Sequence, residues 1–251
     1  MTSSILTESH DGIITVTINR PESLNALTAE SITGLGDALA AAGSARALIL
    51  TGNDRSFSSG ADLQGSVQDG GLGLDEANRV IRSLIDLPIP TIAAVSGPAA
   101  GIGCSLALAC DYTVMSEESY LMLAFTKIGL MPDGGATALV AASAGRHRAL
   151  KMALTAQKVW AREALDWGLA SEVAPVGTQL TRARELAGAW AQGATLAFAA
   201  SKEAINQATL TELDGAFDRE LDGQTRLRAS ADFAEGVAAF IEKRGPKFTG
   251  R

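Results

Sequence analysis

The chain has few of the residues that metal centres, disulfides and charge-relay triads require. Its 251 residues include two histidines, His10 and His147, and two cysteines, Cys104 and Cys110. With so little imidazole and thiol, we expect neither a metal site nor a Ser-His-Asp triad. Both cysteines fall on one apolar segment and point to different faces, so we expect buried free thiols in a reducing cytoplasm.

Long apolar runs and basic residues are also scarce. No apolar run approaches the ~20 residues of a membrane-spanning helix, and the opening MTSSILTESHDG lacks the basic and apolar regions of a secretion signal. A formal charge of -7 argues against nucleic-acid or anionic-membrane partners, although a local basic patch for a phosphorylated ligand is compatible with it. Hydrophobic residues make up 47% and aromatics 5%, which predicts an aliphatic core.

Strand and helix patterns alternate in the first half of the chain, and helices dominate the second half. Short apolar or alternating runs predict strands over 12–19, 46–52, 91–95, 111–116 and 120–122. Helical spacing predicts helices over 28–42, 75–86, 104–110, 136–142, 146–155, 161–167, 180–192, 196–208, 213–227 and 231–243. The Gly-, Ser- and Asp-rich segment 65–73 is expected to be a mobile loop. This order predicts an α/β core followed by a helical C-terminal part.

The stretch from Thr91 to Thr137 contains the pattern most suggestive of chemistry. A buried strand is followed by Gly101-Ile102-Gly103 and then by an apolar helix without a breaker. A helix that starts at a glycine-rich turn presents unpaired N–H groups at its N-terminus. Such groups can stabilise negative charge as it develops on a carbonyl oxygen.

Two segments resemble signatures of the crotonase (enoyl-CoA hydratase/isomerase) superfamily. One is VSGPAAGIGCSLALACD at 95–111, and the other, earlier in the chain, is SFSSGADL at 56–63. The similarity runs from NRPE at 19–22 to FIEKR at 240–244 and covers nearly the whole chain.

The resemblance implies a crotonase-like α/β spiral of strand-strand-helix repeats. Residues 1–195 would form the acyl-CoA-binding core, and residues 196–251 would form a helical region that packs on neighbouring subunits. The expected assembly is a homotrimer or a dimer of trimers. No separate cofactor is expected, because coenzyme A enters as part of the substrate.

The family holds the thioester oxygen with two backbone N–H groups, which the resemblance places at Ser59 and Ile102. Hydratases of the family also use two glutamates. Here those positions hold Ser105 and Phe125. Addition of water needs groups that activate the water and deliver a proton, so a plain hydratase is not expected.

Asp133, in Pro132-Asp133-Gly134-Gly135, matches the catalytic aspartate of enoyl-CoA isomerases and ring-epoxide isomerases in this family. Moving a double bond requires one base and an oxyanion hole, which Asp133 and the two N–H groups would supply. The alternative is that Asp133 caps the following helix. A helix N-terminus lowers an Asp pKa, whereas a base near neutral pH needs a raised pKa, and the sequence leaves this conflict open.

The remaining contacts with substrate are weaker predictions. Lys243 is a candidate for the phosphates of coenzyme A from a neighbouring subunit, although a surface lysine is usually only solvated. Asp62 also fits a structural role, and Ser105 either holds a water or bonds to its own helix backbone. The predicted substrate-binding set is Asn25, Ala26, Gly60, Ala61, Asp62, Leu63, Gly103, Ser105, Phe125 and Lys243.

Three functions are compatible with these residues. The first is an enoyl-CoA isomerase, the second a hydratase or lyase with an unusual base, and the third an acyl-CoA-binding protein without activity. A nucleotide-binding oxidoreductase is not expected, because Leu106 stands where that glycine-rich fingerprint needs a small residue.

Overall fold

The computed structural model describes residues 3–63 and 72–251, and most of the predicted loop 65–73 lies outside these ranges. A six-stranded sheet has the order β1-β2-β3-β4-β6-β9, in which β1 is antiparallel to β2 and the other neighbours are parallel. Its strands are β1 (Ile5–His10), β2 (Ile13–Ile18), β3 (Ala47–Thr51), β4 (Thr91–Val95), β6 (Tyr112–Ser116) and β9 (Glu172–Ala174). A small second sheet consists of β5 (Pro98–Ala100), β7 (Tyr120–Met122) and β8 (Val159–Trp160).

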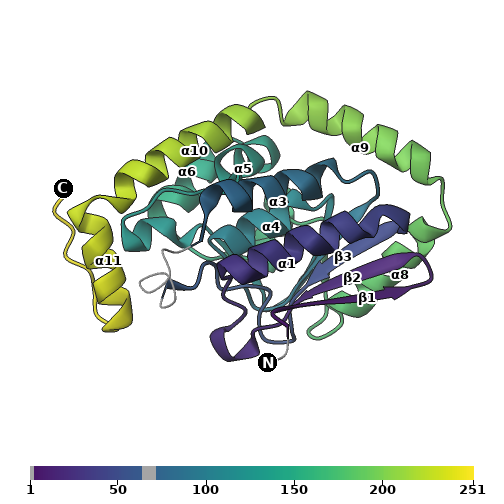
Figure 1. Cartoon of the computed structure of the whole chain (residues 1–251), viewed down its shortest axis with the longest axis horizontal. Helices are drawn as coiled ribbons and strands as arrows, with labels where there is room; N and C mark the ends of the chain where they lie inside the picture. The colour runs from purple at the N-terminus through teal and green to yellow at the C-terminus, as the bar shows by residue number, and fades with distance from the viewer. Residues whose placement is uncertain (1–2, 64–71) are drawn as a thin grey trace.

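Helices cover both faces of the large sheet (Figure 1). The N-terminal half contributes α1 (Ala29–Ala40), α3 (Leu74–Asp86) and α4 (Ile102–Ala109), and the middle contributes α5 (Ala136–Ala144), α6 (Arg146–Thr155) and α7 (Ala161–Trp167). The C-terminal part contributes α8 (Gln179–Ala191), α9 (Thr195–Thr209), α10 (Leu213–Arg228) and α11 (Ala231–Ile241). Short 3-10 segments are η1 (Pro21–Ser23), η2 (Ala41–Ser44) and η3 (Ala124–Ile128). The predicted α/β class is confirmed.

The central strands are buried on both faces. Every residue of β3 and β4 is buried, as expected for parallel strands covered by helices on two sides. Leu48 and Leu50 belong to the core under α1, α3 and α4, whereas Ile49 and Ile92 belong to the core under α8. Alternate side chains of one strand therefore enter two different cores.

The chain between β4 and α4 is shaped by glycines. Gly97 has a φ of 53°, and a side chain there would meet the Arg55 carbonyl. Gly101, directly before α4, has φ 53° and ψ -131°, which side-chain-bearing residues rarely adopt. These two residues turn the chain twice within a short distance, and they place the start of α4 beside the carboxyl end of β4.

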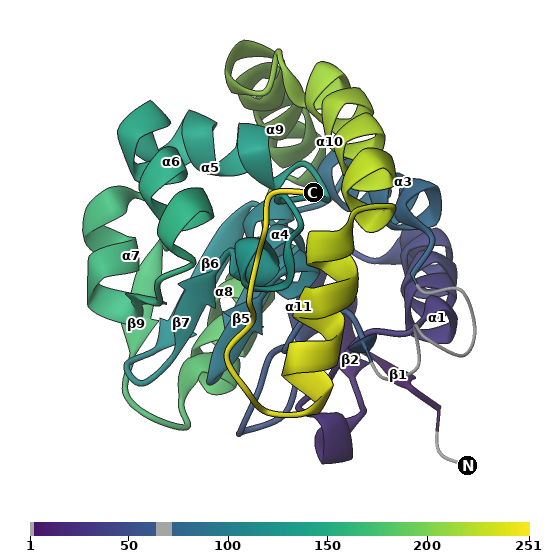
Figure 2. The ribbon, with the colours of Figure 1, turned by 90° about the vertical axis from the view of Figure 1, so that its left-hand side faces the viewer.

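The C-terminal helices contact the chain's own core as well as each other. α10 packs on α3 and α5 (Figures 1 and 2), and α11 packs on η3. The packing is close, because a side chain at Gly236 of α11 would lie 2.6 Å from the backbone of Ile128. Packing of 196–251 on neighbouring subunits stays a prediction. In the described ranges, no helix combines the length and apolarity needed to cross a membrane.

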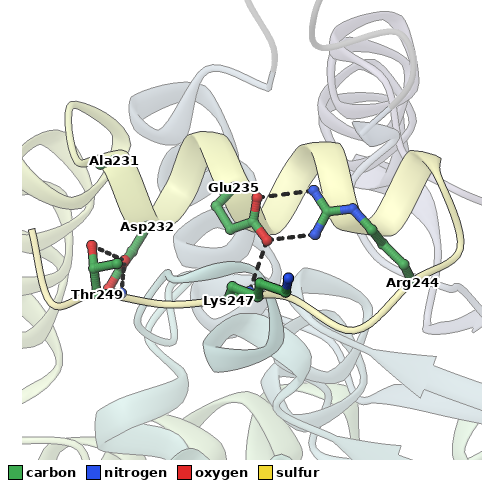
Figure 3. Close-up of a pocket in the computed structure, with 6 residues that line it drawn as sticks. All are labelled: Ala231, Asp232, Glu235, Arg244, Lys247 and Thr249. Atoms are coloured by element: carbon green, nitrogen blue, oxygen red, sulfur yellow. Dashed lines mark hydrogen bonds and ion pairs between the residues drawn. The ribbon is translucent and has the colours of Figure 1, made fainter.

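The last residues turn back along α11. The Asp232 N–H donates to the Arg251 carbonyl at 3.0 Å, and Glu235 pairs with Arg244 and accepts from the Lys247 N–H at 2.7 Å (Figure 3). Arg244 lowers the pKa of Glu235 to about 2. A pocket in this region is lined by two acidic and two basic residues, Asp232, Glu235, Arg244 and Lys247, so its formal charges cancel.

Candidate active site

The two signature segments lie side by side in the structure. The Ser58 N–H donates to the Pro98 carbonyl at 3.0 Å, and the Ala100 N–H returns a bond to the Ser58 carbonyl at 2.9 Å. A side chain at Gly103 would lie 2.7 Å from Cβ of Ser58, and one at Gly60 would lie 3.0 Å from the Ala100 oxygen. Glycine at these two positions therefore permits the contact that brings the segments together.

The prediction for Ser59 needs correction. Its N–H donates to the Leu24 carbonyl at 3.0 Å, so it is not available to a thioester oxygen. Ala61, two residues further along, is better suited, because its N–H has no acceptor among residues 3–63 and 72–251. In the bridge between Ala61 and Leu27, the Leu27 N–H donates to the Gly60 carbonyl and the Asp62 N–H donates to the Leu27 carbonyl. The Ala61 N–H is therefore not used.

Ile102 supplies the second unpaired N–H group. It is the first residue of α4, and its N–H likewise lacks an acceptor within the described parts of the chain, as expected for the first turn of a helix. The Ile102 side chain is 2% exposed and packs in the core. Its size therefore does not prevent a ligand from reaching the backbone.

Phe125 and Ser105 hold the two positions at which the family resemblance led us to expect glutamates in a hydratase. A side chain at Gly101 would lie 3.8 Å from Cζ of Phe125, so the aromatic ring borders the start of α4. Ser105 is fully buried and donates from Oγ to the Asp133 carbonyl at 2.8 Å. The expectation that Ser105 bonds to its own helix is thus wrong. It connects α4 to the loop that carries Asp133.

Asp133 is buried, with 6% of its surface exposed. Its Oδ2 accepts a hydrogen bond from Nε2 of Gln224 at 2.8 Å, whereas its Oδ1 has no partner in the ranges that the structure describes. Burial, which is the largest effect, and the negative charge of Glu220 together raise the pKa of Asp133 to about 7, against the opposing effects of Arg228 and Gln224.

The interpretation of Asp133 as a helix cap is wrong for its side chain. The N-cap residue of α5 is Gly135, which has no side chain that could cap the helix. The carboxylate of Glu220, from α10, accepts instead from the Gly135 N–H at 2.7 Å and the Thr137 N–H at 2.9 Å. Glu220 therefore meets the positive end of α5, and the pKa of Asp133 is raised, by burial first and by the Glu220 charge second.

The expected coenzyme A segments are held together by an arginine that sequence reasoning missed. Nη1 of Arg20 donates to Oδ2 of Asp62 at 2.9 Å and to the Ala26 carbonyl at 2.6 Å. Asn25 is fully buried, and its side chain bonds to the backbone of Arg20 and Ser56. Asn25 and Asp62 thus fix the loops.

Two further residues, Leu63 and Lys243, are expected to contact coenzyme A. Leu63 is half-buried and directly precedes the undescribed 64–71. Lys243 is exposed after the end of α11, with a φ of 55°. Contact of either residue with coenzyme A stays a prediction.

Gln224 and Glu220 were also missed, although the sequence carries a signal for them. The buried face of α10 includes Leu213, Ala216 and Phe217, and the same helical spacing leads on to Glu220 and Gln224. Polar residues that continue an apolar stripe are expected to be buried and to need partners. The pattern does not identify those partners, because they lie 85 and 91 residues earlier in the chain.

Comparison with known proteins identifies the class of protein that this fold and site define. The family model for enoyl-CoA hydratase/isomerase matches residues 8–251. The chain belongs to that family, within the crotonase superfamily, and has its fold.

The individual relatives have more than one activity in their names. A probable enoyl-CoA hydratase of Rhodobacter capsulatus is 42% identical, with 97% of each chain covered. The 1,2-epoxyphenylacetyl-CoA isomerase of Escherichia coli is 38% identical over 100% of both chains. The crystal structure of an enoyl-CoA hydratase from Mycobacterium avium subsp. paratuberculosis is 47% identical, with a TM-score of 0.91 over 99% of this chain and 100% of that one. The family establishes an enzyme acting on acyl-CoA and leaves hydratase and isomerase open.

Proposed function

We propose that the enzyme shifts a double bond in an enoyl-CoA thioester, with Asp133 as the group that moves the proton. The observation that carries this proposal is the environment of Asp133, a buried carboxyl whose pKa is raised to about 7. A base is most effective when its pKa lies near the working pH. The N–H groups of Ala61 and Ile102 would hold the thioester oxygen.

The reaction needs no net change in protons. Asp133 takes a proton from a carbon of the acyl chain, and the electron pair left behind moves into the thioester to give a dienolate. The two N–H groups stabilise the negative oxygen. Asp133 then returns the proton at another carbon, which leaves the double bond in its new place and the carboxylate restored.

Hydration is less well supported, because it calls for a further acid–base group. The carboxylate that acts on the Asp133 pKa is Glu220, and both of its oxygens already accept hydrogen bonds from Gly135 and Thr137. Phe125 is apolar and Ser105 is bonded to the Asp133 carbonyl. The name of the relative from Rhodobacter capsulatus favours a hydratase, so that activity remains the second candidate.

The decisive experiment compares two reactions of the purified protein. trans-3-Hexenoyl-CoA is followed in the ultraviolet for conjugation to the 2-enoyl form, and crotonyl-CoA is followed for hydration. The proposal predicts conjugation without hydration. Hydration would mean that a second acid–base group operates, and silence in both assays calls for 1,2-epoxyphenylacetyl-CoA, the substrate in the name of the relative from Escherichia coli. Tight binding of acyl-CoA without turnover of any of the three would support a binding protein.

A further inference from the structure

One face of α10 carries three polar side chains at intervals of four residues, Glu220, Gln224 and Arg228. Glu220 is 0% exposed and Gln224 is 1% exposed. Burial of such groups is unfavourable unless they are hydrogen-bonded, so their partners indicate their role.

Gln224 is held in one orientation by two acceptors. Its Nε2 donates to the Met131 carbonyl at 2.7 Å and to Oδ2 of Asp133 at 2.8 Å. A carbonyl oxygen only accepts, so the nitrogen of the amide, and not its oxygen, must face Met131. Both amide hydrogens are then used, and Gln224 acts as a donor towards Asp133.

The two oxygens of Asp133 therefore differ. Oδ2 receives the Gln224 donor, while Oδ1 is buried without a partner in the described chain. A donor favours the oxygen that keeps its negative charge, and a proton on Oδ2 would weaken that bond. Oδ1 has no bond to lose, which makes it the atom that takes and returns the proton.

Glu220 fixes the loop around Asp133 from the other side. Its carboxylate accepts from the Gly135 N–H at 2.7 Å and from Oγ1 of Thr137 at 2.6 Å. The Met131 side chain also packs closely on the backbone of α10, because a side chain at Gly223 would lie 2.1 Å from the sulfur of Met131. α10 thus holds the loop both before and after Asp133.

These contacts extend the isomerase proposal above, on which the following inference rests. We propose that Gln224 and Glu220 are positioning residues for Asp133: Gln224 occupies Oδ2 so that the proton passes through Oδ1, and Glu220 anchors the loop and sets the charge beside it.

The inference predicts that substitutions of Gln224 and Glu220 shift the titration midpoint of Asp133 in opposite directions. Gln224→Met removes the donor that favours the carboxylate, so the midpoint of the Asp133 titration should rise by about one pH unit. Glu220→Gln removes a negative charge, so the midpoint should fall. The charged groups of α10 that act on Asp133 are Glu220 and Arg228, and Arg228→Met should raise the midpoint.

The experiment follows Asp133 in two ways, by the pH dependence of kcat/KM for conjugation and by carbon NMR of labelled aspartate, assigned with Asp133→Asn. Asp222→Asn is the matched control, because it removes a charge from the exposed face of α10. We expect no shift in the control, a rise for Gln224→Met and a fall for Glu220→Gln. Arg228→Met replaces Glu220→Gln as the charge test if loss of the α5 cap prevents folding.

The outcomes separate this inference from the proposed reaction. Folded variants that share the wild-type midpoint would overturn the positioning role, even if the wild type isomerises its substrate. NMR shifts in the directions predicted for each variant, in a protein that does not isomerise any 3-enoyl-CoA, would support the positioning role and refute the proposed reaction. A loss of activity without any shift in midpoint would reduce both residues to structural contacts.

Discussion

At the scale of single residues, Asp133 is a buried carboxyl of which one oxygen, Oδ2, has a partner among residues 3–63 and 72–251 and the other has none. The fold keeps its pKa near 7 because burial disfavours the charged form and Glu220 adds a like charge. A surface aspartate would be a far weaker base at the same pH. The environment of this residue, and not its identity alone, makes it suited to proton transfer.

The activity should therefore depend on pH in a defined direction. Asp133 must be ionised to take a proton, so kcat/KM for conjugation should rise with pH and reach half of its maximum near pH 7. A profile measured from pH 5 to 9 on trans-3-hexenoyl-CoA tests this. A rate that is already maximal at pH 5 would contradict a raised pKa for the base.

The same pKa has a consequence for stability. The pKa of Asp133 is raised from 3.8 to about 7 in the folded state. The contribution of this carboxyl to the free energy of unfolding is therefore fully present below pH 3.8 and is lost as the pH rises through 7. Asp133→Asn should be more stable than the wild type at pH 8, on the order of 2 kcal/mol, and the difference should shrink towards pH 5. Denaturant melts at both pH values measure this. Asp222→Asn, which is exposed, should show no such pH-dependent difference, and an Asp133 variant that is equally destabilised at both pH values would contradict the account.

At the scale of elements, the contact between the two signature segments depends on the absence of a side chain at Gly103. An added Cβ would lie 2.7 Å from Cβ of Ser58, so either α4 or the segment at Ser58 must move. Gly103→Ala should destabilise the protein by about 1–3 kcal/mol and also lower kcat, because the Ile102 N–H moves with α4.

The matched control for that variant is Gly188→Ala. Gly188 lies within α8, and a Cβ there meets no atom within 4 Å. Because alanine is a better helix former than glycine, the control should gain about 0.5–1 kcal/mol. Thermal unfolding of both variants measures the contrast, and equal effects at the two sites would refute the packing argument.

The sequence predicted elements with a clear apolar pattern better than elements without one. The buried strand β4 and the helices α6 and α7 agree with the structure at both ends. The edge strand β1 was missed, since only Ile5 of its residues is buried and no alternation appears. β5 was not predicted, because its three residues between two glycines contain no period.

The site was predictable where its residues belong to one contiguous segment. Asp133, Ile102, Ser105 and Phe125 all lie in the stretch 91–137. The bonds from Gln224 and Glu220 span 91 and 85 residues along the chain. No local pattern specifies which loop a distant helix will meet, so these contacts could be found only in the folded chain.

At the scale of the whole molecule, α9 has apolar side chains that contacts within a single chain do not bury. None of its residues is buried, and Leu196 is 88% and Ile205 61% exposed. Apolar side chains exposed in this way are typical of contact surfaces. With the predicted trimer or dimer of trimers, light scattering should give three or six times the chain mass of 25.9 kDa. A double variant Leu196→Glu and Ile205→Glu should lower that mass, and a monomeric wild type would refute the prediction.

The central claim is that Asp133 alone carries the proton, and Asp133→Asn tests it most directly. The measurement is kcat on trans-3-hexenoyl-CoA together with the Kd of a saturated acyl-CoA that cannot react. We predict a fall in kcat of about 10²–10⁴ with a nearly unchanged Kd, because the side chain removed belongs to the transition state and not to coenzyme A binding. Equal turnover by Asp133→Asn and the wild type would contradict the claim.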